Sequence, residues 1–334
     1  MKPADRPSVE HGRIGVLLIN LGTPDAPEPA AVRRYLAEFL SDPRVIEIPR
    51  IAWLPILHGI ILRTRPRKSA RAYKQVWTEE GSPLAAITRR QAEGLQQRLG
   101  ENVIVDFAMR YGNPGIGKSI ENLASLGCER ILAAPLYPQH CAATTASAVD
   151  AVFGKLASMR RQPALRTLPP YYDDPRHIDA LKGSIERQLA PLDFEPQRLL
   201  LSFHGMPERT RQLGDPYHDQ CQETARLLGQ TLSIPTDIAF QSRFGRAKWL
   251  EPATDKVLSA YPEQGVRRIA IAAPGFSADC VETVEELGIR GRATFLKNGG
   301  EAFARLECLN DSPEGMNMLE ALVSRELAGW LLAP

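Results

Sequence analysis

Short apolar runs alternate with helix-like patterns along this chain, and the alternation predicts an α/β fold. Apolar residues recur with a helical period in, for example, residues 88–99 and 215–228. Strands that alternate with helices are typical of βαβ units, so we expect parallel sheets. Continuous apolar runs, which are typical of strands buried in such sheets, occupy residues 14–19, 103–109, 130–136, 199–203, 237–240 and 267–273.

Three short motifs occur twice in the same order, which indicates two similar halves. The second and third motifs recur after nearly equal intervals, whereas the first recurs after an interval about 50 residues longer. Residues 24–81 are therefore expected to be an insertion in the first half. The motifs are a strand followed by Gly and Pro, then Arg-aromatic-Gly, then Ala-Ala-Pro, and the copies lie at residues 19–24 and 203–207, 110–112 and 243–245, and 133–135 and 272–274.

This repeat predicts two similar doubly wound (Rossmann-like) parallel-sheet domains with a cleft between them. We expect residues 10–165 to form the first domain, with the insertion 24–81 as an added lip. A C-terminal helix within residues 305–334 should pack back on this domain, and residues 166–304 should form the second one. Ligands of open α/β sheets bind beyond the carboxyl ends of the strands, so the motifs should meet at the cleft.

Composition narrows the function classes only slightly. The 334 residues are 43% apolar with a formal net charge of +2, which gives no electrostatic reason to expect nucleic acid as a partner. The five cysteines are widely spaced and lack zinc-site spacing, as in a reducing compartment. The start of the chain is polar, and the longest nearly apolar run, residues 51–62, is shorter than the roughly 20 residues that span a bilayer. We therefore expect a cytoplasmic protein, with peripheral membrane contact left open.

One segment fits a phosphate-binding pattern and supports an alternative function. Residues 112–119 match GxxxxGK[ST] and lie between a predicted strand and a predicted helix. A P-loop enzyme also needs an apolar strand that ends in Asp, which holds Mg²⁺. None of the predicted strands ends in Asp. A P-loop nucleotidase is therefore the weaker alternative.

A histidine and three carboxylates lie near predicted strand ends in the second half. His204 ends an apolar strand, where its imidazole could exchange protons near neutral pH or bind a metal ion. Glu282 and Glu286 are four residues apart on a predicted helix over residues 276–286, and Asp279 is three residues before Glu282. These carboxylates are either an exposed acidic face or a route for a divalent cation toward His204.

The insertion combines an apolar segment with a basic one. Trp53, Ile56 and Ile60 belong to the apolar residues 51–62, and arginine and lysine residues follow directly. The pattern fits two structures about equally well. One is a core helix with a charged end. The other is an apolar lip with a basic rim, which could bind a flat, hydrophobic anion or an anionic membrane surface.

Taken together, these motifs resemble the ferrochelatase family over residues 15–322. The resemblance implies insertion of Fe²⁺ into protoporphyrin IX, giving protohaem and two protons in the last step of haem synthesis. The stretches that carry it are residues 17–24, 203–207, 214–217, 240–245, 249–250 and 274–283.

The resemblance also implies roles for individual residues. His204 and Glu282 would be the catalytic and iron-binding pair, with Glu286 and Asp279 as a metal path. Leu21, which would also contact the substrate, takes the place of a Tyr or Met that faces the metal centre in other members. Porphyrin contacts would come from Tyr73, Arg110, Phe276 and, in the lip, Trp53, Ile56 and Ile60.

No cofactor beyond the Fe²⁺ substrate is implied, and we expect no iron–sulfur cluster. Members with a cluster often carry grouped cysteines near the C-terminus, where this chain has only Cys308. The sequence leaves open whether His204 is the base or an iron ligand, which metal is preferred, and whether coproporphyrin is used instead. A non-catalytic tetrapyrrole or metal carrier is a further alternative.

Overall fold

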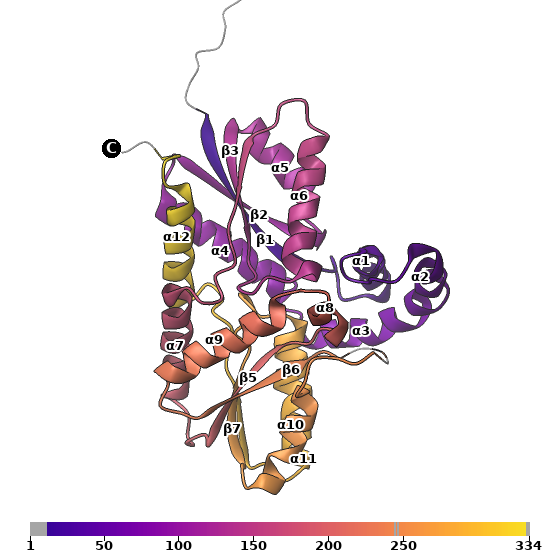
Figure 1. Cartoon of the computed structure of the whole chain (residues 1–334), viewed down its shortest axis with the longest axis vertical. Helices are drawn as coiled ribbons and strands as arrows, with labels where there is room; N and C mark the ends of the chain where they lie inside the picture. Colours follow the sequence, from indigo (N-terminus) through magenta and orange to yellow (C-terminus); the bar gives the residue numbers. More distant parts are fainter. Residues whose placement is uncertain (1–11, 244, 246, 332–334) are drawn as a thin grey trace, which may run out of the picture.

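The computed structural model describes residues 12–331, except residues 244 and 246. The polar start of the chain, on which the expected lack of a secretion signal rests, and Phe244 of the second Arg-aromatic-Gly motif lie outside the described residues. The described chain forms two four-stranded parallel sheets, each flanked by helices (Figure 1).

The two sheets have the same strand order, as the sequence repeat predicts. The first sheet is ordered β2-β1-β3-β4 and the second β6-β5-β7-β8. Each predicted apolar run coincides largely with a strand, but the two short edge strands, β4 and β8, lack such a run and were not predicted. The strands are β1 (Arg13–Thr23), β2 (Val103–Gly112), β3 (Cys128–Pro135), β4 (Ala164–Thr167), β5 (Arg198–His204), β6 (Thr236–Gln241), β7 (Arg268–Ala272) and β8 (Ala302–Arg305).

Helices cover both sheets, and a π-helical segment follows the third strand of each half. These segments are η2 (Ala142–Ala146) after β3 and η4 (Glu282–Gly291) after β7. Short π-helical segments are frequent at functional sites. The other helices of the two halves are α4 (Pro83–Leu99), α5 (Ile116–Ser125), α6 (Ser147–Ala157), α7 (Pro175–Leu189), α8 (Glu208–Gln212), α9 (Tyr217–Thr231), α10 (Thr254–Ala260), η3 (Pro262–Gln264) and α11 (Arg292–Lys297).

The insertion forms a lip that projects from one side of the molecule (Figure 1). Its buried side chains, among them Val32, Leu36 and Leu57, form an apolar cluster of their own, which also includes Tyr111 of β2. The lip is therefore anchored to the carboxyl end of the first sheet. It consists of α1 (Pro29–Ser41), α2 (Arg50–Ile56), η1 (Leu57–Ile61) and α3 (Leu62–Val76).

The last helix, α12 (Pro313–Leu327), returns to the first sheet. Ser312 caps it by accepting a hydrogen bond from the Gly315 amide at 3.2 Å, and Pro313 occupies its first position. The helix packs against α4, β3 and α7. Beyond its end, Arg130 donates to the Trp330 carbonyl at 3.0 Å. The C-terminal helix thus contacts the first half through α4 and β3 and the second half through α7.

Candidate active site between the lip and the second sheet

His204 is the last residue of β5 and is held by its own turn. Its Nδ1 lies 2.7 Å from the Gly205 carbonyl oxygen. A carbonyl oxygen only accepts, so this contact places the proton on Nδ1 and leaves the lone pair on Nε2. Tyr217 also donates its hydroxyl to the His204 carbonyl at 3.0 Å. The imidazole is thus oriented with one nitrogen available to accept a proton or to bind a metal ion.

The turn after His204 requires glycine. A Cβ on Gly205 would lie 2.5 Å from the Gln241 carbonyl oxygen, too close for any real contact. The close approach lets the Gly205 amide donate to that oxygen at 2.7 Å. The Phe276 ring lies nearby, with its centroid 6.4 Å from that of the His204 ring. The structure therefore brings His204 and Phe276 close together.

Glu282 is the first residue of η4 and lies beside the lip. Burial raises the pKa of Tyr73 well above its usual value, and the nearby Glu282 carboxylate raises it further. The same two causes, in the same order, raise the pKa of Cys280. Because Tyr73 belongs to α3, which contacts η4, the lip lies close to the Glu282 carboxylate.

The first half contributes an apolar wall to the same place. Leu21, near the end of β1, and Val281, just before Glu282, both pack against the lip cluster that contains Tyr35 and Tyr73. The structure thus brings Leu21 and Tyr73 together with the start of η4. We call the region formed by these side chains and His204, Glu282 and Phe276 the inter-half junction.

Asp279 lies outside the acidic row that the sequence predicts. The helix begins at Glu282 rather than at residue 276, so Asp279 lies in the preceding loop. Its buried carboxylate accepts hydrogen bonds from Arg305 at 2.8 Å, Thr283 at 2.6 Å and Asn310 at 2.8 Å. Because its oxygens are occupied by these donors, Asp279 joins the loop to β8 and cannot serve as the expected step for a passing cation.

Glu286 remains on the same helix as Glu282 and borders a cavity. Its two carboxylate oxygens accept from the Ser242 amide at 2.9 Å and hydroxyl at 2.6 Å. The cavity, of about 510 Å³, is also lined by Gln241, Arg243 and Arg290. Glu286 therefore stands between this cavity and the start of η4.

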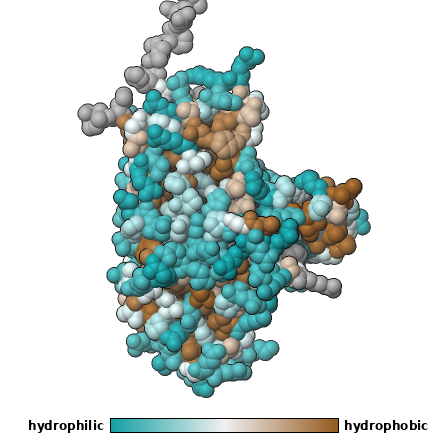
Figure 2. Space-filling view, viewed as in Figure 1, coloured by the Kyte–Doolittle hydropathy of each residue, from teal (hydrophilic) through white to brown (hydrophobic). Residues whose placement is uncertain are grey.

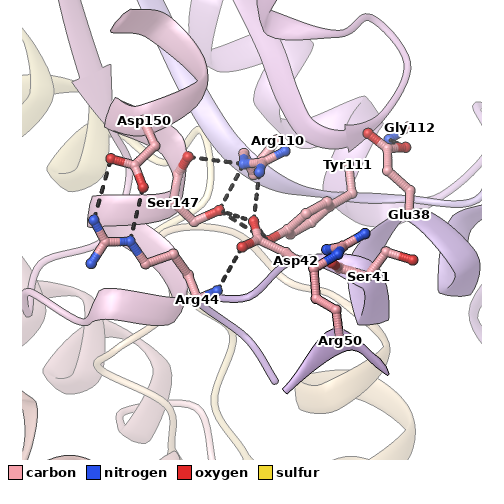
Figure 3. Close-up of polar contacts among 10 residues, drawn as sticks. All are labelled: Glu38, Ser41, Asp42, Arg44, Arg50, Arg110, Tyr111, Gly112, Ser147 and Asp150. Carbon is pink, nitrogen blue, oxygen red and sulfur yellow. Dashed lines mark hydrogen bonds and ion pairs between the residues drawn. The ribbon is translucent and has the colours of Figure 1, made fainter. Parts of the chain in front are cut away.

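Arg110 is held by a polar network that includes Asp42 and Ser147 (Figure 3). Its Nε donates to the Ser147 hydroxyl and carbonyl at 2.7 and 2.9 Å, and its Nη2 lies 2.5 Å from the Asp42 carboxylate. Asp42 also accepts from Ser147 at 2.6 Å, from Tyr111 at 2.8 Å and from the Arg44 amide at 2.7 Å. Burial alone would raise the pKa of Asp42, but the bonds from Ser147 and Arg44 hold it below its usual value.

The lip residues expected to contact porphyrin divide into two groups. Trp53 is only 8% exposed, and its indole N–H donates to the Leu40 carbonyl at 2.6 Å. Trp53 therefore belongs to the core of the lip, which corrects its assignment as a contact residue. Ile56 and Ile60 are 41% and 58% exposed and remain available.

The phosphate-binding pattern does not form a P-loop. Residues 112–119 fold back on β2, because the Met109 amide donates to the Pro114 carbonyl at 2.7 Å. The buried Ser119 hydroxyl, which would hold Mg²⁺ in a P-loop, donates instead to the Phe107 carbonyl at 3.0 Å. The geometry therefore removes the nucleotidase alternative.

Sequence reasoning assigned no role to two residues that the structure places around the site. Asp42 has no signal in the sequence, because it reaches Arg110 only through the fold of the lip. Gln241 lies within a motif of the resemblance, residues 240–245, but its contacts depend on the fold, which pairs the end of β6 with β5 and brings it within reach of η4. No group of three or more His, Cys, Asp or Glu side chains suited to a metal ion occurs in residues 12–331, the two undescribed positions aside.

Comparisons with known proteins show which family the sequence matches. A sequence model of the Ferrochelatase family matches residues 13–327. The chain is 53% identical to the Ferrochelatase of Rhizobium meliloti (strain 1021) and 51% identical to that of Agrobacterium fabrum (strain C58 / ATCC 33970), and each alignment covers 98% of both chains.

Solved structures share the fold at low sequence identity. SirB from Bacillus subtilis with Fe³⁺ has a TM-score of 0.56 at 13% identity and covers 95% of this chain and 97% of its own. CbiX, described as the terminal enzyme of sirohaem biosynthesis in denitrifying bacteria, has a TM-score of 0.52 at 16% identity, over 94% of this chain and 100% of its own. These similarities support the two-half α/β fold.

Proposed function

This chain belongs to the ferrochelatase family and inserts Fe²⁺ into protoporphyrin IX, and from that premise we propose that His204 and Glu282 carry the reaction. The enzyme is a lyase of haem biosynthesis, and its reaction gives protohaem and two protons. The observation that supports these two residues is their common neighbour. Gln241 pairs with His204 in the sheet and donates to the Glu282 carbonyl at 3.1 Å.

Metalation requires two chemical changes, and the His204 and Glu282 side chains can assist both. The two pyrrole N–H bonds must break, so that the nitrogen lone pairs can bind Fe²⁺, and the ion must lose its water. The Nε2 lone pair of His204 can take the pyrrole protons one after the other, and the Glu282 carboxylate can pass them to solvent. Imidazole and carboxylate are also suitable ligands for Fe²⁺ while it sheds water.

The apolar side chains of the junction would hold the macrocycle. Leu21 from the first half and Phe276 from the second would contact its faces, with Tyr73 and the exposed Ile56 and Ile60 toward the lip. A flat macrocycle hides its nitrogen lone pairs, so a site that binds it bent would spend binding energy on exposing them. Arg110, beyond Leu21, would face the porphyrin from the first sheet.

The iron would arrive through the cavity beside Glu286. This carboxylate and Glu282 are four residues apart on η4. A cation that enters the cavity would meet Glu286 first and Glu282 next. Asp279 has no part in this route, since it is buried in the loop before η4 and paired with Arg305 and Asn310.

Replacement of Glu282 tests the proposal. Glu282→Gln keeps the shape of the side chain and loses its charge, so anaerobic metalation should fall by at least ~10²-fold. Porphyrin fluorescence quenching should show nearly unchanged binding. The change of the visible spectrum on iron insertion measures turnover. Normal turnover in this variant would refute the proposal, and tight haem retention without turnover in the unaltered protein would indicate a carrier instead.

We also propose that the lip contacts an anionic membrane surface. Its tip exposes Ile51, Ile56 and Ile60, and Figure 2 shows the hydrophobic colour gathered on this projection. The exposed cations that follow include Arg63 and Arg67. Such residues attract anionic lipid by about 1 kcal/mol each near the surface. In the described part of the chain, no helix has both the length and the apolar character to cross a bilayer, so this contact would be peripheral.

Vesicle binding tests the lip proposal. Ile51, Ile56 and Ile60 replaced together by Ser should weaken binding to vesicles that contain phosphatidylserine, because the apolar tip is lost. Replacement of the exposed Phe153 on α6 by Ser is the matched control and should leave binding unchanged. Equal binding by the lip variant and the unaltered protein would overturn the proposal.

A further inference from the structure

Gln241 is buried at the carboxyl end of β6, directly beside His204. The two residues are partners in the parallel ladder of β5 and β6. The Gln241 carbonyl accepts the Gly205 amide at 2.7 Å, which fixes the turn that holds the imidazole. The main chain of Gln241 therefore fixes the position of His204.

The side chain of Gln241 reaches in the other direction, to η4. Its Nε2 donates to the Glu282 carbonyl at 3.1 Å, and its Oε1 accepts from the Ser202 hydroxyl at 2.7 Å. These two bonds distinguish the ends of the amide, so its orientation is determined. Ser202 in turn lies 2.8 Å from the Thr254 hydroxyl. The result is a buried chain of hydrogen bonds from α10 to the first residue of η4.

The first half has a comparable link, but without the catalytic pair. The register of β1 and β2 places Arg110 beside Leu21, as Gln241 stands beside His204. Arg110 donates to the carbonyl of Ser147, just after η2, as Gln241 donates to that of Glu282. Each half thus joins its second strand to the segment after its third strand, but only the second half carries His and Glu at the joined positions.

The position of Glu282 depends on this link because Glu282 lies in the first turn of its helix. Val281 before it is already helical, and Asp279 joins the preceding loop, residues 273–280, to β8. The Gln241 amide adds a bond from β6 to the carbonyl of Glu282 in this first helical turn. A misplacement of a reacting group by about 1 Å can cost 10²-fold in rate. A buried, oriented amide at this point restricts such movement.

We propose that Gln241 is a positioning residue that holds His204 and Glu282 in fixed relation to each other. The inference rests on the proposed function of these two residues. It assigns to Gln241 no contact with porphyrin or iron. Loss of its side-chain bonds should therefore lower the rate of metalation and leave porphyrin binding nearly intact.

Gln241→Met removes both side-chain hydrogen bonds at similar length. We expect kcat for Fe²⁺ insertion into protoporphyrin IX to fall by at least about 10-fold, and porphyrin affinity, measured by fluorescence quenching, to change by less than about 3-fold. Thr254→Val is the matched control, because it breaks the same buried chain without touching Glu282. It should reduce stability similarly while kcat stays near normal.

A double variant separates positioning from a general loss of structure. In a Glu282→Gln background, Gln241→Met should lower kcat no further, since the group that it positions is already lost. If Gln241→Met does not fold, Ser202→Ala, which removes one of the two bonds that orient the amide, should still lower kcat by a few-fold with unchanged porphyrin affinity. Normal kcat in Gln241→Met, or in Ser202→Ala where only that variant folds, would overturn the inference.

The same experiment distinguishes failure of this inference from failure of the proposed function. Normal turnover of Glu282→Gln and His204→Ala would remove the catalytic pair itself. Loss of turnover in those two variants, together with a normal Gln241→Met enzyme, would refute only the role of Gln241. An equal loss of kcat in Thr254→Val and Gln241→Met would also refute the role of Gln241, because the loss would then follow from reduced stability.

Discussion

Neighbouring carboxylates on η4 have different surroundings, and these determine what each contributes. Glu285 is buried, and both of its oxygens lie 2.9 Å from Nε of Arg290. Glu285 adjoins Glu286 in sequence and so lies about 100° round the helix from it. The charge of Glu285 is paired within its own helix. Glu282 instead lies beside the lip, where its charge raises the pKa of Tyr73.

Glu285→Gln should therefore affect stability more than chemistry. The amide keeps the shape but weakens a charge-assisted contact, so the free energy of unfolding should fall by about 1–3 kcal/mol. Metalation per folded molecule should stay near normal. Denaturant unfolding beside anaerobic turnover measures both. A variant that is stable but inactive would contradict this assignment, because it would indicate that the Glu285 face of η4 lies at the junction.

His177 links stability to pH. It is buried in α7, with Nδ1 3.3 Å from the Met318 sulfur, and its Nε2 has no hydrogen-bond partner among the described residues. Burial lowers its pKa from 6.5 to about 4. The unfolded chain thus binds the extra proton at a higher pH than the folded chain, so stability is full above about pH 6.5 and declines as pH falls toward 4.

The expected loss from this one group is about 3 kcal/mol across that range. His177→Leu should remove this part of the pH dependence, so its free energy of unfolding should fall less between pH 7.5 and pH 4.5 than that of the unaltered protein. Urea unfolding at the two pH values checks this. Parallel losses in both proteins would show that His177 takes up no additional proton on unfolding.

At the scale of elements, Asp42 attaches the lip to the first half. It follows α1 and joins the end of β2 to the start of α6 through Arg110, Tyr111 and Ser147. Removal of one partner from a buried ion pair leaves the other charge without compensation. The lip and the first sheet should therefore lose stability together when Asp42 loses its charge.

Asp42→Asn should lower the free energy of unfolding by about 3–5 kcal/mol. Asp150→Asn is the control, because Asp150 pairs with Arg44 of the same loop but both side chains are about half exposed. That change should cost at most about 1 kcal/mol. Equal, small losses in the two variants would show that the Asp42 network contributes little to the attachment of the lip.

Element boundaries mark the limits of the sequence analysis. Six strands were predictable because continuous apolar runs identify buried parallel strands. The edge strands β4 and β8 have only four residues each and lack a continuous apolar run. The start of η4 was misplaced because Asp279, three residues before Glu282, looks helical until its loop contacts with Arg305 and Asn310 are known.

For the whole molecule, most of the predicted architecture follows from the internal repeat. It predicted two similar sheets, the insertion, and the sheet edges at which the motifs lie. It could not show that Trp53 is buried in the lip or that Asp42 and Gln241 hold the site. Those facts depend on contacts between residues far apart in the sequence.

The distribution of cysteines bears on the whole protein as well. We propose that it holds no iron–sulfur cluster, because the five thiols are buried at separate places in the sequence and clusters usually need four thiolates. Protein purified anaerobically should contain no acid-labile sulfide. Sulfide in stoichiometric amount in such a sample would contradict this.

The central claim is that His204 acts in metalation and not in holding porphyrin. His204→Ala should perturb the fold little, since the turn at Gly205 is fixed by the backbone bond to Gln241. Most porphyrin contact should come from apolar surface. The measurement is anaerobic Fe²⁺ insertion beside porphyrin fluorescence quenching for this variant. The account predicts nearly unchanged binding with turnover reduced by at least ~10²-fold, and near-normal turnover would contradict it.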